Sequence, residues 1–111
     1  MQPKIYWVYV TAASTEEAQR IGETVVQERL AACANVLSNM QSCYWWQGNF
    51  ERDQEAVLIL KTSVQRFPAL LERIKQLHSY TVPCVLALPV LEGNLDYLQW
   101  VEQETAQEHK Q

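Results

Sequence analysis

Short apolar runs alternate along the chain with stretches of helical periodicity. Ile5–Ala12 is β-branched and aromatic with no polar side, so it predicts a strand that is covered on both faces. Ser14 and Glu17 form an S-x-x-E pattern, which is typical of a helix start. Apolar side chains then recur every three or four residues, which predicts a helix over residues 15–33 with one face on a sheet.

Two adjoining strands are predicted in the middle of the chain. Residues 36–50 are rich in aromatic side chains, and residues 51–63 change from charged to wholly apolar. Gly48 and Asn49 lie between them and are typical of a hairpin tip. Adjacent tryptophans on a strand, Trp45 and Trp46, must face opposite sides.

The last third of the chain predicts a helix, a strand and a helix. Apolar spacing favours a helix over residues 66–79, and Pro89 favours an edge position for a strand over residues 84–91. Asn94 is a candidate N-cap for a third helix over residues 95–103. We expect that helix to turn three side chains inward: Tyr97, Leu98 and Val101.

The order of these elements is β-α-β-β-α-β with an added helix, which predicts a ferredoxin-like α+β sandwich in one domain over residues 1–111. Right-handed crossovers place both long helices on one side of the sheet. The other face would then expose more than the roughly 300–600 Å² of apolar patch usual for a monomer. We therefore expect a homo-oligomer built through the sheet, in which the Trp45-Trp46 hairpin reaches a neighbour. The alternative is that the third helix folds back and covers the bare face.

Composition narrows the class of partner and the compartment. The chain has 111 residues, a net charge of -4 and a pI near 5.1, so it lacks the basic surface that nucleic-acid binding needs. Three widely spaced cysteines without a C-x-x-C motif favour a reducing compartment. The first residues show neither a signal peptide nor a membrane span, so we expect a cytoplasmic protein with no membrane partner.

Few residues point to chemistry by themselves. His78 ends an apolar helical stripe and Cys84 begins a strand, so the plain interpretation of both is packing. Convergence with Glu55 or Lys61 would instead suit Zn²⁺ or Cu²⁺. Three carboxylates alternate on one strand face and fit either a solvated edge or an acid-base or cation-binding group: Glu51, Asp53 and Glu55. No nucleophile elbow, phosphate loop or dinucleotide fingerprint occurs, so we expect no enzyme.

Several blocks taken together resemble the CutA, or divalent-cation tolerance, family. The resemblance runs from Val8 to Val101 and covers most of the chain. Its blocks are residues 28–36 (ERLAACANV), 42–48 (SCYWWQG), Glu51 and Glu55, 60–62 (LKT), His78 with Tyr80, Val82 and Pro83, 87–90 (ALPV), and Gly93 with Tyr97, Leu98, Trp100 and Val101.

The resemblance implies a tight homotrimer of ferredoxin-like subunits, similar in architecture to the PII signalling proteins and linked to tolerance of copper and other divalent metals. Metal-binding members of the family have Cys where Val10 stands and His where Leu77 stands. Many relatives also have Pro where Ser79 stands, Glu where Cys84 stands and a Gly-Lys hairpin tip in place of Gly48-Asn49. Any copper or zinc site would thus be an altered one, formed by His78, Cys84 and Glu55.

These observations lead to a hypothesis and two rivals. We expect a non-enzymatic trimer that binds a metal ion or small ligand at clefts between subunits, in heavy-metal tolerance or signalling. The candidate cleft residues occupy family positions beside an apolar interface: Trp46, Glu55, Lys61, Tyr80, His78 and Cys84. The first rival is a PII-like metabolite or nucleotide sensor without a metal role. The second is an enzyme that uses His78 and Glu55 as acid and base.

Overall fold

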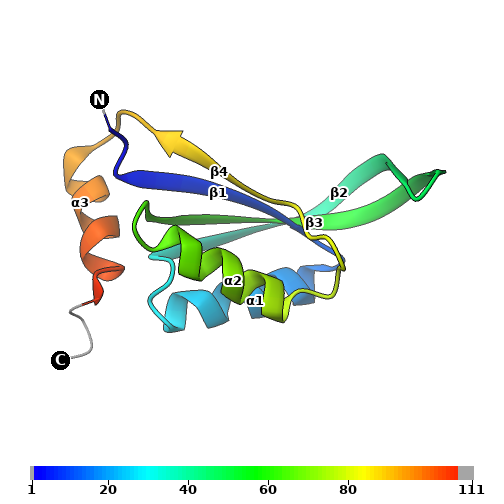
Figure 1. The fold of residues 1–111 in the computed structure, drawn as a ribbon, viewed down its shortest axis with the longest axis horizontal. Helices are drawn as coiled ribbons and strands as arrows, with labels where there is room; N and C mark the ends of the chain where they lie inside the picture. Colours follow the sequence, from blue (N-terminus) through cyan, green and yellow to red (C-terminus); the bar gives the residue numbers. More distant parts are fainter. Residues whose placement is uncertain (1, 108–111) are drawn as a thin grey trace.

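A computed structural model describes residues 2–107, and its elements follow the predicted order (Figure 1). The elements are β1 (Ile5–Ala12), α1 (Thr15–Gln27), β2 (Cys33–Trp46), β3 (Asn49–Ser63), α2 (Phe67–Leu77), β4 (Val85–Val90) and α3 (Leu95–Glu104). The four strands form one antiparallel sheet in the order β2-β3-β1-β4. This is the predicted ferredoxin-like α+β topology, and none of the helices within residues 2–107 is long and apolar enough to span a membrane.

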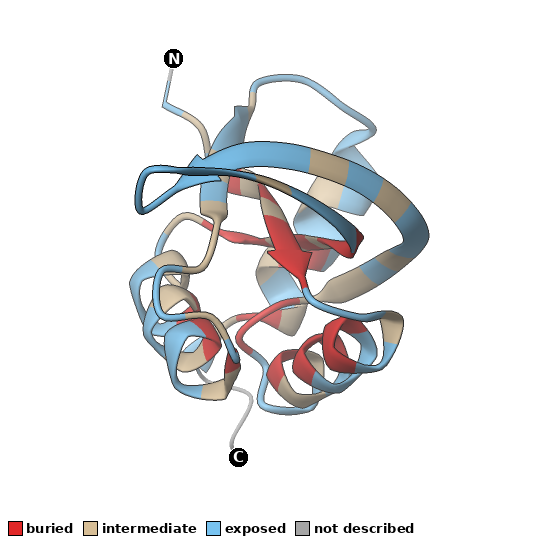
Figure 2. Ribbon diagram, turned by 90° about the vertical axis from the view of Figure 1, so that its right-hand side faces the viewer, coloured by how far each residue is buried: buried red, intermediate tan, exposed pale blue. Residues whose placement is uncertain are grey.

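The core lies between the sheet and two helices, α1 and α2, which cover the same face (Figures 1 and 2). Alternate residues of β1 and β3 point into it, because successive side chains of a strand face opposite sides. The side chains that these strands contribute are fully or almost fully buried: Val8, Val10, Ala12, Ala56, Leu58 and Leu60. Ile21 and Val25 of α1, with Leu70 and Ile74 of α2, complete the layer.

Helix α1 begins as predicted but ends six residues early. The Ser14 hydroxyl accepts a hydrogen bond from the Glu17 amide at 3.1 Å, which confirms the N-cap. The expected helix over residues 15–33 is wrong at its far end, because Arg29 has φ 65 and so leaves the right-handed helix. The amides of Leu30 and Ala31 fold back to the Val25 carbonyl and close the end. Cys33 is therefore the first residue of β2.

The β2-β3 hairpin turns at Gln47 and Gly48, one residue earlier than predicted. Both residues have positive φ, 51 and 84, as two-residue hairpin turns with the mirror-image geometry require. Trp46 pairs with Asn49 across the turn, so Phe50 belongs to β3 rather than to the preceding strand. Trp45 pairs with Phe50, and their rings meet edge to face at 5.6 Å.

Boundaries in the last third differ from prediction by one or two residues. Arg66 is the N-cap of α2, and Leu77 rather than Ser79 is its last residue. Strand β4 lies at the edge of the sheet, as Pro89 predicted. Asn94 caps α3 by accepting a hydrogen bond from the Asp96 amide. Val101 is buried as expected, whereas Tyr97 stays 41% exposed, with its ring tilted against that of Trp100 at 5.6 Å.

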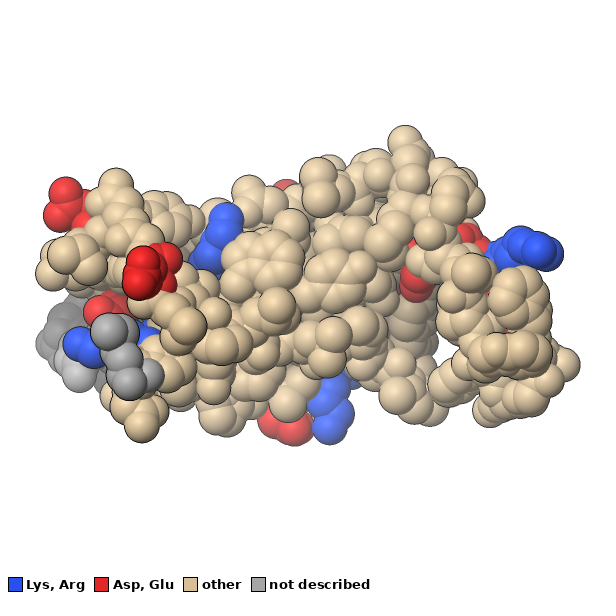
Figure 3. Space-filling view, turned by 90° about the horizontal axis from the view of Figure 1, so that it is seen from above, with Lys and Arg blue, Asp and Glu red and all other residues tan. Residues whose placement is uncertain are grey.

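The sheet face opposite α1 and α2 is largely uncovered, and we call it the open face. It consists of apolar side chains from all four strands: Trp7, Tyr9, Leu37, Ile59, Leu86 and Leu88. Leu37 and Leu86 are each 56% exposed. Charged groups lie mainly around the rim and ends of this surface (Figure 3).

Helix α3 covers only one end of the open face. It contacts β1 and β3, and the Thr105 hydroxyl donates to Ser63 Oγ at 3.2 Å. Ile5, at that end, is 3% exposed. The alternative that the third helix covers the whole bare face is therefore wrong for residues 2–107, since a helix of 10 residues at the end of the sheet leaves its centre open.

Candidate functional site

The β2-β3 hairpin bends where β2 carries an extra residue. The pairing shifts between Leu37 and Met40, so that Ser38 and Asn39 together oppose Ala56. Asn39 has φ 65, a conformation that asparagine tolerates better than most residues. The bulge keeps Met40 on the same side of the sheet as Glu55, its direct partner. The hairpin then extends beyond the rest of the molecule (Figure 1).

A pocket of about 630 Å³ lies at the base of this hairpin, at the edge of the open face. Tyr9 and Thr11 of β1 form one wall, alternate β2 residues form another, and the segment that connects α2 to β4 forms the third. Its lining includes Met40, Ser42, Tyr44, Trp46, Glu55, Tyr80 and Cys84. The surface is hollowed where the hairpin leaves the sheet (Figure 3). This volume is within the range of small-molecule sites.

Glu55 and Tyr80 form the polar centre of the pocket. Glu55 is 7% exposed, and the Tyr80 hydroxyl donates a hydrogen bond to its Oε2 at 2.6 Å. Burial and this bond to the carboxylate raise the pKa of Tyr80. Tyr80 therefore stays a neutral phenol and a hydrogen-bond donor over the physiological pH range.

His78 positions Tyr80 and has no free nitrogen of its own. Its side chain is fully buried, and Nε2 lies 2.7 Å from the Thr11 carbonyl oxygen, to which it can only donate. Nδ1 accepts a hydrogen bond from the Tyr80 amide at 3.1 Å. The two rings lie 4.7 Å apart. Both nitrogens are occupied, which agrees with the packing interpretation of His78.

Glu17, at the start of α1, holds the segment that contains Ser79 and Tyr80. Its Oε1 accepts a hydrogen bond from the Ala13 amide at 2.9 Å, and its Oε2 accepts one from the Ser79 amide at 2.7 Å. Burial would raise the pKa of Glu17, but these hydrogen bonds hold it below its ordinary value. The carboxylate is thus ionised at neutral pH and fixes the segment that carries Tyr80.

Cys84 lines the pocket but does not join a metal cluster. Burial raises the pKa of its thiol, which keeps the sulfur protonated at neutral pH. Within residues 2–107 no group of three or more His, Cys, Asp or Glu side chains is arranged to hold a metal ion. The altered site expected from His78, Cys84 and Glu55 is therefore not formed by residues 2–107 of one subunit, since the lone pair of the histidine accepts the Tyr80 amide and the three side chains do not converge.

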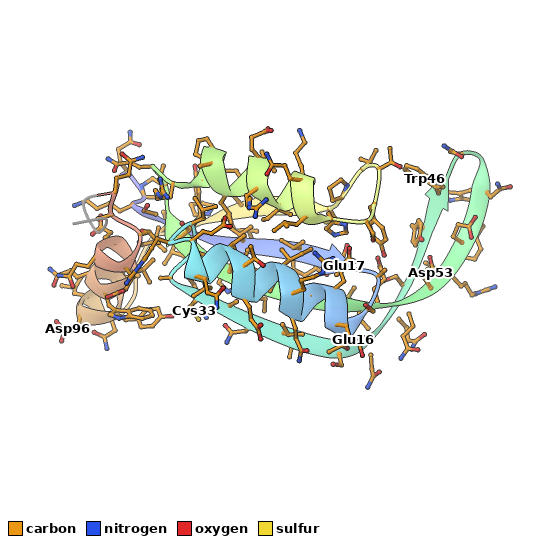
Figure 4. All side chains as sticks on the ribbon, turned by 90° about the horizontal axis from the view of Figure 1, so that it is seen from below. Glu16, Glu17, Cys33, Trp46, Asp53 and Asp96 are labelled. Atoms are coloured by element: carbon orange, nitrogen blue, oxygen red, sulfur yellow. The ribbon has the colours of Figure 1, made fainter. Side chains whose placement is uncertain are left out.

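Lys61 lies at the other end of the open face, away from the pocket. It pairs with Cys33 across the sheet, six residues along β3 from Glu55, which is about 20 Å at the rise of a strand. Its ammonium donates to Asn35 Oδ1 at 2.7 Å. Figure 4 shows Cys33 near α3, whereas Trp46 and Asp53 lie on the hairpin. Within a single subunit Lys61 thus does not meet Trp46, Glu55 or Tyr80.

Several pocket residues were not anticipated from the sequence: Tyr9, Thr11, Met40, Ser42 and Tyr44. Strand alternation places Tyr9 and Thr11 on one face of β1, so that signal was present. No such signal indicated the register of the hairpin, because the bulge at Asn39 decides which β2 side chains face Glu55. The alternating carboxylates of β3 are not all solvated, as the interpretation of them as a solvated edge requires. Asp53 is exposed, but Glu55 is buried.

Comparison with known proteins gives the family. A family model described as CutA1 divalent ion tolerance protein matches residues 6–104. The chain belongs to the CutA1 family. The divalent-cation tolerance protein CutA of Thermus thermophilus is 48% identical over 98 residues, which are 88% of this chain and 95% of that protein. The corresponding protein of Archaeoglobus fulgidus is 37% identical over 97 residues, 87% of this chain and 94% of that one.

Solved CutA1 structures have the same fold. The Oryza sativa structure superposes with a TM-score of 0.90 at 40% identity and covers 95% of this chain and 96% of its own. The Thermus thermophilus structure gives 0.89 at 46% identity and covers 92% and 99%. The CutA1 relatives are named for tolerance of divalent cations rather than for a reaction. An Oryza sativa relative is described as chloroplastic and the Archaeoglobus fulgidus structure as that of a periplasmic protein.

Proposed function

We propose that this CutA1 chain is a cytoplasmic, non-catalytic binding protein that forms a homotrimer through its open face and holds a small ligand in the Glu55-Tyr80 pocket, in the service of divalent-cation tolerance. The position of the pocket carries the proposal. It lies at the edge of the open face and is lined by Trp46 from a hairpin that leaves the body of the subunit. A neighbour that covers that face would close the pocket as well.

The apolar character of the open face supports the assembly. Leu86 and Leu88 are 56% and 44% exposed on the edge strand, and Trp45 at the hairpin is 73% exposed. Large apolar surfaces of this kind mark interaction sites. The number of subunits, three, comes from the family resemblance.

A thermal-melt screen of metal-free small metabolites tests the binding role. A ligand at 100 times its Kd stabilises the folded protein by about 2.7 kcal/mol, and we expect at least one such ligand. Trp46→Ala should weaken its binding, because it removes one wall of the pocket. Trp100→Ala is the matched control, since Trp100 lies on α3 beside Tyr97 and does not line the pocket. Failure of every compound, or equal loss in both variants, would contradict the proposal.

The description of the family as divalent ion tolerance proteins favours one second candidate, a metal ion bound between subunits at His78 and Cys84. Calorimetric titration with Cu²⁺ and Zn²⁺ of the wild type and of His78→Ala tests it. Because both His78 nitrogens are occupied, we expect the two proteins to bind these ions equally. Loss of binding in the variant alone would favour the metal site.

A further inference from the structure

The pocket contains a buried carboxylate with no cationic side chain beside it among residues 2–107 of one subunit. Glu55 is the one carboxylate in the lining formed by these residues, and that lining has no lysine, arginine or histidine. The ion pairs in this part of the chain do not include Glu55. Its partner is the neutral phenol of Tyr80, bonded to one of the two carboxylate oxygens. A buried carboxylate with so few partners is costly, and a cation beside it would lower that cost.

The lining of the pocket that holds this carboxylate includes four aromatic residues. Tyr9, Tyr44, Trp46 and Tyr80 come from three parts of the chain and line the same pocket. The faces of aromatic rings attract cations, tryptophan most strongly. The Tyr44 hydroxyl donates a hydrogen bond to Asp53, and this bond raises the pKa of the phenol to about 12, so Tyr44 stays neutral. The aromatic rings and the carboxylate therefore both favour a positively charged ligand.

We propose that the pocket binds a small organic cation, a substituted ammonium whose head group contacts Glu55 and the aromatic rings. This rests on the proposed binding function and names its ligand class. Phosphate-bearing metabolites, nucleotides included, are disfavoured because the lining offers them a carboxylate and no cation. A divalent ion would need several converging donors, and residues 2–107 provide no such cluster. The volume of about 630 Å³ admits an ammonium ion with its alkyl substituents.

Calorimetric titration with choline and its neutral isostere 3,3-dimethylbutan-1-ol tests the charge requirement, since the two probes share a shape. The wild type should bind choline on the order of 10-fold tighter than the alcohol. Glu55→Gln keeps the shape of the side chain and removes the charge, so it should reduce this preference several-fold and leave only the contribution of the aromatic rings. Glu16→Gln removes one negative charge from an exposed site on α1 and should leave the preference intact.

A second variant keeps the test independent of any effect of Glu55→Gln on folding. Trp46→Ala removes an aromatic wall at a partly exposed hairpin position and should weaken choline binding several-fold. Equal affinity of the wild type for choline and the alcohol, or a preference that Glu55→Gln leaves unchanged, would overturn the inference. Binding of inorganic phosphate or Zn²⁺ in place of choline would also overturn it, while the proposed binding function would stand. Failure of every compound in the melt screen would remove both the inference and the proposed binding function.

Discussion

Glu17 is the carboxylate that joins α1 to the turn carrying Tyr80. Its two oxygens accept hydrogen bonds from the amides of Ala13 and Ser79, and Ser79 is 62 residues away from Glu17 in the chain. Its pKa is lowered below the ordinary 4.5 in the folded protein. A depressed folded-state pKa contributes stability that is present above the unfolded pKa and is lost as the pH falls through the folded value. The window for this loss therefore lies below about pH 4.5.

Glu17→Gln should destabilise the protein at neutral pH by about 1–3 kcal/mol, because one buried amide loses its acceptor. The variant should also lose less stability than the wild type as the pH falls below 5, since the titrating carboxylate is gone. Urea unfolding across this pH range measures both effects. Glu16→Gln, on the exposed side of the same turn, is the control and should behave like the wild type. Parallel pH profiles for wild type and Glu17→Gln would show that this carboxylate is not the cause.

The sequence predicts one of the two structural roles of Glu17, the one at the start of α1. The S-x-x-E pattern gave the Ser14 cap and suggested that the carboxylate satisfies an amide at the helix start. Its second partner, the Ser79 amide, depends on how α2 ends beside α1 and has no local signal. The same holds for His78, whose two hydrogen-bond partners, Thr11 and Tyr80, become visible only in the folded chain.

Helix α1 approaches the sheet closely at Gly22. A Cβ at this position would lie 3.0 Å from Ala34 Cβ and 3.0 Å from Leu58 Cδ1, and Ala34 Cβ is fixed to the backbone of β2. Overpacking costs about 1–3 kcal/mol, whereas alanine gains about 1 kcal/mol over glycine in a helix.

Gly22→Ala should therefore destabilise the fold by about 1 kcal/mol net. Chemical denaturation against Gln19→Ala, an exposed position of the same helix, measures the difference. The control should change stability by about 0.5 kcal/mol or less. A Gly22→Ala variant more stable than the wild type would show that α1 has room to move away from the sheet.

At the level of elements, the sequence predicted type and order better than boundaries. Hydrophobic periodicity identified α1, but its end lacks the glycine that usually marks a left-handed residue, and Arg29 takes that conformation instead. In the hairpin, Gln47 rather than Asn49 joins Gly48 in the turn, so β2 ends at Trp46 instead of residue 50 and β3 begins at Asn49 instead of residue 51. The bulge at Asn39 then decides which side chains of β2 reach the pocket, and the periodicity contained no signal for it.

In the whole molecule, helices cover one face of the sheet and leave most of the other face open. Alternating apolar residues on β1, β3 and β4 predicted that both sheet faces are hydrophobic, and the structure shows α1 and α2 on one face and only the end of α3 on the other. Sequence periodicity could predict this imbalance because it follows from strand alternation and crossover handedness. It could not fix the pocket, which depends on where the hairpin bends.

The mass of the protein in dilute solution tests the central claim that copies of the chain cover the open face. Sedimentation velocity at low micromolar concentration should give three copies of the 12.9 kDa chain. Leu86→Arg should dissociate this assembly, since Leu86 lies on the open face, while Gln19→Arg on α1 should not. A wild-type protein that sediments as a folded single chain, with a circular dichroism spectrum unchanged on dilution, would contradict the account.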